Sequence, residues 1–91
     1  MGKSISREFV IRNKFGIHAR PASLFVQTSA RFEAEISVRK DKQVIDGKSI
    51  LGMLMLAAVQ GTRLKVSASG KDAIKALDSL ESLINSNFGE E

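Results

Sequence analysis

The sequence predicts an α+β domain in which an open sheet is covered by helices on one face. Three segments, 5–12, 33–39 and 63–69, alternate apolar and polar residues, as strands with one buried face do. The segment 74–88 instead repeats apolar residues every three or four positions, which is typical of an amphipathic helix. A chain of 91 residues suffices for one small domain. We therefore expect a two-layer sandwich of strands and helices.

The first half of the chain is predicted to form a strand, a helix and a hairpin. Strand 5–12 would bury Ile5, Phe9 and Ile11, and a turn at 13–16 leads into a helix over about 19–30. Strand 33–39 would bury its three apolar residues, and its partner strand returns from a hairpin tip at 41–42 through 44–45.

The second half is predicted to form a helix, a strand and a last helix. Ser49 is a good N-cap for a short helix, and strand 63–69 would bury Leu64, Val66 and Ala68. Asp72 is expected to cap the last helix. Its core residues are predicted to be Ile74, Leu77, Leu80, Ile84 and Phe88. The order is therefore β-α-β-β-α-β-α.

Composition excludes several classes of protein. The chain has no cysteine and one histidine, so neither a disulfide nor a zinc site is expected, and a reducing cytoplasm fits. No apolar stretch is long enough for a membrane span, and no secretory signal is recognised at the N-terminus. Residues 1–65 carry twelve Lys/Arg against five Asp/Glu, but no Tyr or Trp accompanies them. We interpret this charge as steering an acidic protein partner, with nucleic-acid binding as a rival hypothesis.

The segment from Gly16 to Ala22 reads Gly-Ile-His-Ala-Arg-Pro-Ala and contains the one histidine, His18, and the one proline, Pro21. Proline is favoured in the first turn of a helix, so His18 should lie at a helix N-terminus, where backbone N–H groups favour an anion. The guanidinium of Arg20 suits phosphate oxygens. An imidazole placed there can hold a phosphoryl group covalently and release it. The alternative is a histidine that only caps the helix or faces solvent.

The sequence His-Ala-Arg-Pro-Ala at 18–22 resembles the signature of the HPr family, the histidine-containing phosphocarriers of the bacterial phosphoenolpyruvate-dependent phosphotransferase system. Lys-Ser-Ile-Leu-Gly at 48–52 resembles the regulatory serine segment of that family, and Gly61 with 64–70 also fits. The resemblance covers essentially the whole chain as one domain, 1–91. It implies a four-stranded antiparallel sheet of order 1-4-2-3 with three helices on one face.

The resemblance also implies a mechanism. Phospho-enzyme I would transfer its phosphoryl group to Nδ1 of His18 while Arg20 holds the phosphoryl oxygens and Pro21 fixes the helix start. The group would then pass to a IIA-type acceptor. No metal, nucleotide or other cofactor is expected, and the chain would be a monomeric covalent carrier, not a turnover enzyme. A purely allosteric binding module, in which His18 is never phosphorylated, is the second rival hypothesis.

The segment 50–59 is apolar except for Gly52, although a helix on a two-layer domain buries only one stripe. Met53 and Leu56 are expected to face the sheet. Exposed apolar residues would then form a docking surface for phosphotransfer partners, consisting of Ile50, Leu51, Leu54 and Met55. The alternative is a more deeply buried helix. Residues at the rim of this surface are predicted on the first helix at Ala19, Ser23 and Gln27.

Ser49 has a regulatory interpretation besides its role as a helix cap. In the HPr family the corresponding serine is phosphorylated by a dedicated kinase, so HPr kinase/phosphorylase is a possible partner. Phe15 and the segments 54–57 and 84–91 look more like NPr, the paralogue of a nitrogen-related branch, whereas 48–50 looks like the kinase-regulated type. A regulatory NPr-like carrier is therefore the alternative to a sugar-transport carrier.

Overall fold

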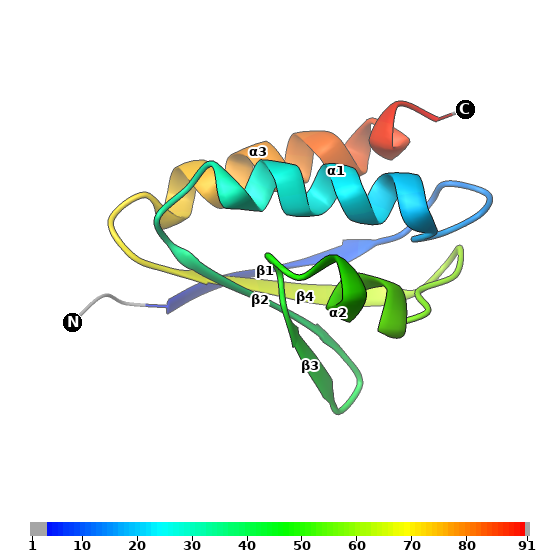
Figure 1. Cartoon of the computed structure of the whole chain (residues 1–91), viewed down its shortest axis with the longest axis horizontal. Helices are drawn as coiled ribbons and strands as arrows, with labels where there is room; N and C mark the ends of the chain where they lie inside the picture. The colour runs from blue at the N-terminus through cyan, green and yellow to red at the C-terminus, as the bar shows by residue number, and fades with distance from the viewer. Residues whose placement is uncertain (1–3, 91) are drawn as a thin grey trace.

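The computed structural model describes residues 4–90 and has the predicted order of elements (Figure 1). Residues 1–3 and Glu91, the ends of the expected domain, lie outside the described residues. The elements are β1 (Ser4–Val10), α1 (Ala19–Ala30), β2 (Glu35–Lys40), β3 (Gln43–Asp46), α2 (Ile50–Met55), β4 (Arg63–Ser69), α3 (Ala73–Asn85) and a short turn, η1 (Asn87–Gly89).

The sheet has the strand order β1-β4-β2-β3, and all neighbouring strands are antiparallel. The register pairs Phe9 with Leu64 and Val38 with Val66, which brings the buried residues of three strands onto one face. The three helices cover this face, with α1 and α3 side by side along it (Figure 1). The predicted fold class and strand order are therefore confirmed.

The core lies between the sheet and the helices and contains most of the predicted residues. Ile36, Val38, Leu77, Leu80 and Ile84 are all buried. Ile74 was expected among them, but it is 62% exposed, so that prediction is wrong. The first turns of α3 instead place their alanines, at 73 and 76, against the core, which leaves Ile74 on the outer flank of the helix.

Asp72 is the N-cap residue of α3, as predicted, but its side chain makes no hydrogen bond to that helix. Its carboxylate instead accepts hydrogen bonds from the backbone N–H groups of Glu33 (2.9 Å) and Ala34 (2.8 Å). Because both oxygens of the carboxylate already accept hydrogen bonds, the side chain gains little by rotating toward the N–H groups of its own helix. The bonds from Glu33 and then Ala34 lower the pKa of Asp72. Asp72 thus ties the α1–β2 connection to the start of α3.

This tie predicts a specific acid sensitivity. Because the pKa of Asp72 is lower in the folded chain than in the unfolded chain, its contribution is complete above the ordinary value of about 3.9 and is lost as pH falls through the folded value. We expect Asp72→Asn to lower the free energy of unfolding at pH 7 and to flatten its decline below pH 4. Urea unfolding between pH 2 and pH 7 measures this, with Glu33→Gln as the control. Parallel profiles for Asp72→Asn and the wild type would contradict the assignment.

Candidate functional site

His18 is the N-cap residue of α1, as the sequence predicts. Its backbone is extended (φ −93°, ψ −166°), and the N–H of Ala22 donates to its carbonyl oxygen at 3.0 Å. The backbone N–H groups of Ala19 and Arg20 therefore come before the first helical hydrogen bond, and Pro21 has no N–H to leave unpaired. The first turn of α1 thus presents free donors beside the half-exposed imidazole. This geometry suits an anion.

The loop before His18 is fixed against the connection that follows α2. Ile17 donates its backbone N–H to the carbonyl oxygen of Ala58 at 2.8 Å. Gly16 has a φ of +66°, and a Cβ there would overlap the same carbonyl oxygen and lie 2.8 Å from Cα of Val59. Only glycine allows both this conformation and this close approach. The loop therefore places the imidazole beside the surface of α2.

The carboxylate of Glu90 contacts the imidazole of His18, and the sequence analysis did not predict this contact. Its Oε2 lies 2.8 Å from Nε2 of His18, and its Oε1 accepts a hydrogen bond from Nδ2 of Asn13 at 3.0 Å. The same Oε2 is 4.0 Å from Nη1 of Arg20. The bond from Asn13, followed by that from His18, lowers the pKa of Glu90. Glu90 is thus held as a carboxylate against the imidazole.

No pattern in the sequence points to this contact, because His18 and Glu90 are separated by 72 positions. The only feature of the sequence that could have indicated Glu90 is its place as an acidic residue directly after a Phe-Gly pair, near the end of the chain. Arg20, which the sequence did predict, has its guanidinium on the same side, where Nη1 donates to the carbonyl oxygen of Phe88 at 3.5 Å. The C-terminal segment therefore contacts both side chains, Arg20 through the carbonyl oxygen of Phe88 and His18 through Glu90.

The ring of Phe15 lies beside the imidazole of His18. It is 72% exposed and meets the His18 ring edge to face, with centroids 6.3 Å apart and an interplanar angle of 89°. The ammonium of Lys14 lies 5.5 Å from the centre of the same ring. An exposed aromatic side chain in this position adds apolar surface directly beside the imidazole.

The α2 helix has the exposed apolar residues that the sequence predicts. Met53 and Leu56 are fully buried, as predicted, but the other face of the helix is exposed, so the alternative of a more deeply buried helix is wrong. That exposed face, called the α2 patch below, consists of Ile50 (46% exposed), Leu51 (67%), Leu54 (38%) and Met55 (62%). Val59, also exposed, joins the patch to the loop at Gly16.

The predicted rim residues share one side of α1. Ala19 and Gln27 are exposed and Ser23 is half-buried, and Nε2 of Gln27 donates to the hydroxyl oxygen of Ser23 at 3.1 Å. They begin at the first residue of the helix, next to His18. The structure therefore places them where a partner that covers the imidazole would also meet them.

Ser49 caps α2 as predicted, because its hydroxyl oxygen accepts a hydrogen bond from the backbone N–H of Gly52 at 2.9 Å. Lys48 fixes the preceding position: its backbone N–H donates to Oδ1 of Asp46 at 2.9 Å, and its Nζ donates to the carbonyl oxygen of Phe32 at 2.8 Å. Ser49 is half-buried and directly adjoins the α2 patch. A charge added to this hydroxyl would lie at the edge of that patch.

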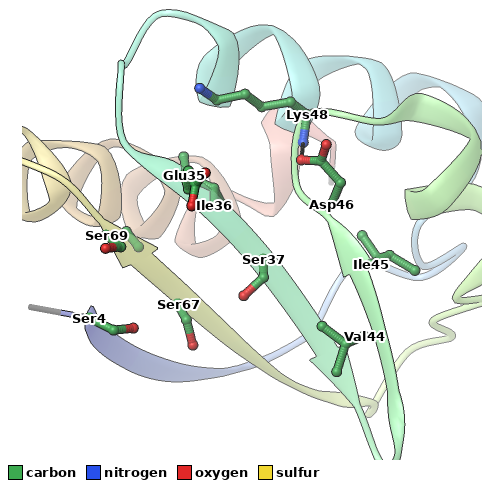
Figure 2. Close-up of a pocket in the computed structure, with 11 residues that line it drawn as sticks. Ser4, Glu35, Ile36, Ser37, Val44, Ile45, Asp46, Lys48, Ser67 and Ser69 are labelled. Atoms are coloured by element: carbon green, nitrogen blue, oxygen red, sulfur yellow. Dashed lines mark hydrogen bonds between the residues drawn. The ribbon is translucent and has the colours of Figure 1, made fainter. Parts of the chain in front are cut away.

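The open face of the sheet has a separate hollow of about 530 Å³ (Figure 2). Serine side chains of three strands, Ser4, Ser37, Ser67 and Ser69, line it together with Glu35, Asp46 and Lys48. His18, Arg20 and the α2 patch do not line this hollow. Within residues 4–90, no cluster of three or more metal-binding side chains occurs, and no helix has the length and apolarity of a membrane span.

Comparison with known proteins identifies the family of this chain. Residues 5–86 match a family model described as the PTS HPr component phosphorylation site. The chain is 41% identical over 86 residues to the phosphocarrier protein HPr of Neisseria meningitidis serogroup A, covering 94% of this chain and 97% of that protein. It is 42% identical over 86 residues to HPr of Pseudomonas putida, covering 93% and 96%. The crystal structure of HPr-C-His from Thermoanaerobacter tengcongensis superposes with a TM-score of 0.92 at 46% identity, covering 96% and 98%.

The close packing at Gly16 predicts a selective loss of stability. Gly16→Ala should lower the free energy of unfolding by more than about 1 kcal/mol, because a side chain in the left-handed region is unfavourable and here also overlaps Ala58. Gly61→Ala is a matched control, since Gly61 also has a positive φ (+91°) but open space around its Cβ position. Urea unfolding of both variants measures the difference. Equal losses would show that the contact with Ala58 adds nothing.

Proposed function

Because the chain belongs to the HPr family and is a phosphocarrier of the phosphotransferase system, we propose that His18 is the residue that carries the phosphoryl group. The donor is phospho-enzyme I and the recipient a IIA-type protein. The observation that carries this proposal is the imidazole at the start of α1, with Nε2 against Glu90 and Nδ1 left for chemistry. The proposed carrier uses no cofactor. It is no turnover enzyme, because it only holds each phosphoryl group between the donor and the recipient.

The transfer is an in-line displacement at phosphorus. The lone pair of Nδ1 of neutral His18 forms the new N–P bond while the bond between phosphorus and the donor breaks and its electron pair stays with the donor. The backbone N–H groups of Ala19 and Arg20 and the guanidinium of Arg20 stabilise the charge on the phosphoryl oxygens. Pro21 holds the first turn so that these donors are in place before the partner arrives.

Partners dock on the surface that surrounds the imidazole. The α2 patch supplies the apolar contact, and Ala19, Ser23 and Gln27 supply the rim on α1. Because one carrier must serve both a donor and an acceptor, flexible and exposed side chains such as Met55 suit this surface. We assign to this surface alone the docking of both kinds of partner.

A second element of the proposal is regulation at Ser49. Phosphorylation by HPr kinase/phosphorylase adds close to two negative charges at the edge of the α2 patch, which weakens docking of an acidic partner. We further propose that the carrier acts as a monomer in the cytoplasm. The relatives named above are HPr proteins, and nothing in the comparisons supports the nitrogen-branch alternative.

The assignment of His18 is tested by the mass of the intact protein after incubation with phosphoenolpyruvate, magnesium and an active enzyme I. We expect one phosphoryl group that is labile in acid and stable in alkali, as a phosphoramidate is, and that His18→Ala lacks. The rival hypotheses of an allosteric module or a nucleic-acid-binding domain predict no such group. An unmodified wild type beside a control carrier that is phosphorylated would refute the proposal.

Docking through the α2 patch predicts a kinetic effect without a folding effect. Leu51→Lys should raise KM for phosphotransfer from enzyme I about fivefold or more, since loss of a central interface contact costs about 1 kcal/mol or more. The variant should unfold like the wild type because Leu51 is exposed. Val44→Lys is the matched control, as Val44 is 59% exposed on β3 and lines the open face. An equal KM in both variants would exclude the patch as the docking surface.

Regulation at Ser49 is tested with HPr kinase/phosphorylase and ATP. We expect one phosphate on the wild type, none on Ser49→Ala, and a slower subsequent phosphorylation of His18 by enzyme I. Ser49→Ala should also lower the free energy of unfolding by about 1 kcal/mol, because the cap on the N–H of Gly52 is lost. Ser37→Ala serves as the control. Unchanged transfer to His18 in the Ser49-phosphorylated protein would contradict the regulatory role.

A further inference from the structure

We propose that Glu90 is a positioning residue for phosphotransfer: supported by Asn13, it keeps the proton of the His18 imidazole on Nε2 and turns Nδ1 toward the incoming phosphoryl group. This inference rests on the proposed role of His18 and assigns the origin of its nucleophilic tautomer. Three observations carry it, namely the path of the C-terminal segment, the rigid support of Glu90 by Asn13, and the contact with Nε2.

The C-terminal segment is folded back onto the site by an unusual backbone. After α3 ends at Asn85, three consecutive residues, Asn87, Phe88 and Gly89, have positive φ values of 55°, 55° and 75°. Non-glycine residues adopt such values at a conformational cost, so other contacts must hold them there. The side chain of Phe88 is 1% exposed within the core and provides that anchor. The turn then delivers Glu90 to His18.

Asn13 holds the carboxylate of Glu90 in place. Its Nδ2 donates to Oε1 of Glu90 at 3.0 Å and to the carbonyl oxygen of Gly16 at 2.7 Å. Asn13 is 1% exposed, and the backbone N–H of Glu90 donates to the carbonyl oxygen of Asn87 at 2.8 Å. Glu90 is therefore attached both to the loop that carries His18 and to its own turn, and its side chain is only 17% exposed.

The second oxygen of Glu90 then selects the tautomer. An ionised carboxylate only accepts hydrogen bonds, so the ring nitrogen 2.8 Å from it must carry a proton. In the neutral imidazole this leaves the lone pair on Nδ1. Hydrogen bonds from Asn13 and His18 lower the pKa of Glu90, which keeps it ionised at neutral pH. A carboxylate behind a functional histidine fixes ring orientation and tautomer in the same way at metal sites and in hydrolases.

Glu90 also faces Arg20, whose Nη1 is 4.0 Å from Oε2 and 3.5 Å from the carbonyl oxygen of Phe88. The unphosphorylated site thus keeps the guanidinium close to the imidazole through the same segment. When the phosphoryl group arrives, its oxygens compete with Glu90 for Arg20. Glu90 therefore acts on both groups that the transfer requires.

The experiment compares Glu90→Ala and Glu90→Gln with the wild type, and uses Glu35→Gln as the control. Glu35 is exposed and lines the hollow on the open face of the sheet. Nitrogen NMR of the unphosphorylated imidazole at alkaline pH reports the tautomer, and rapid-mixing transfer from phospho-enzyme I gives the maximum rate and KM separately. Thermal unfolding is measured on every variant.

We expect the wild type and Glu35→Gln to hold the Nε2–H tautomer, and Glu90→Ala to shift toward a mixture. The maximum transfer rate of Glu90→Ala should fall about 10- to 100-fold with little change in KM, the size typical for loss of such a supporting contact. Glu90→Gln keeps the shape without the charge and should fall between the two. Both readouts must move, since a purely structural role would lower only the unfolding temperature.

An unchanged tautomer or an unchanged maximum rate in Glu90→Ala overturns the inference while His18 phosphorylation, and so the proposed function, stands. A wild type that takes up no phosphoryl group in the same assay refutes the proposed function, and this inference with it. Phe88→Ala provides a second check that leaves Glu90 itself intact. It removes the anchor of the turn and should shift the tautomer in the same direction as Glu90→Ala.

Discussion

Ile17 donates its backbone N–H to the carbonyl oxygen of Ala58, and the rest of the site depends on this contact. It joins the loop that carries His18 to the connection between α2 and β4, beyond the residues that the β1–β4 pairing holds together. Gly16 makes the approach possible because nothing larger fits against Ala58. As a result the imidazole and the α2 patch become one surface, so that a protein that docks on α2 reaches His18.

The sheet contributes by holding in place the two segments that this hydrogen bond joins. Antiparallel pairing of β1 with β4 holds the strands that lead into and out of the two joined segments, and Gly61 N–H donates to the carbonyl oxygen of Ile11 at 2.7 Å just beyond that pairing. The buried face supplies the stability, while the groups proposed to act lie at one end of the helical layer. A rigid scaffold that holds exposed groups in place suits a phosphocarrier.

The sequence predicted the strands, the helices and the place of His18 at the start of a helix because these depend on local patterns. Alternation defined β2 and β4, and Pro21 marked the start of α1. The strand order and the antiparallel pairing came from the family resemblance, which the comparisons support. Two details were not predicted. The carboxylate of Asp72 accepts hydrogen bonds from the N–H groups of Glu33 and Ala34, which are distant in sequence, and not from its own helix. The three-residue spacing also could not show that Ile74 faces outward.

Glu90 could not be predicted because its position depends on left-handed residues whose conformation the buried Phe88 imposes.

The central claim concerns which nitrogen of His18 reacts, and nitrogen–phosphorus correlations in the NMR spectrum of the phosphorylated protein decide it most directly. The account predicts the phosphoryl group on Nδ1, with Nε2 still protonated against Glu90. A phosphoryl group on Nε2 would contradict it, because that nitrogen faces the carboxylate of Glu90.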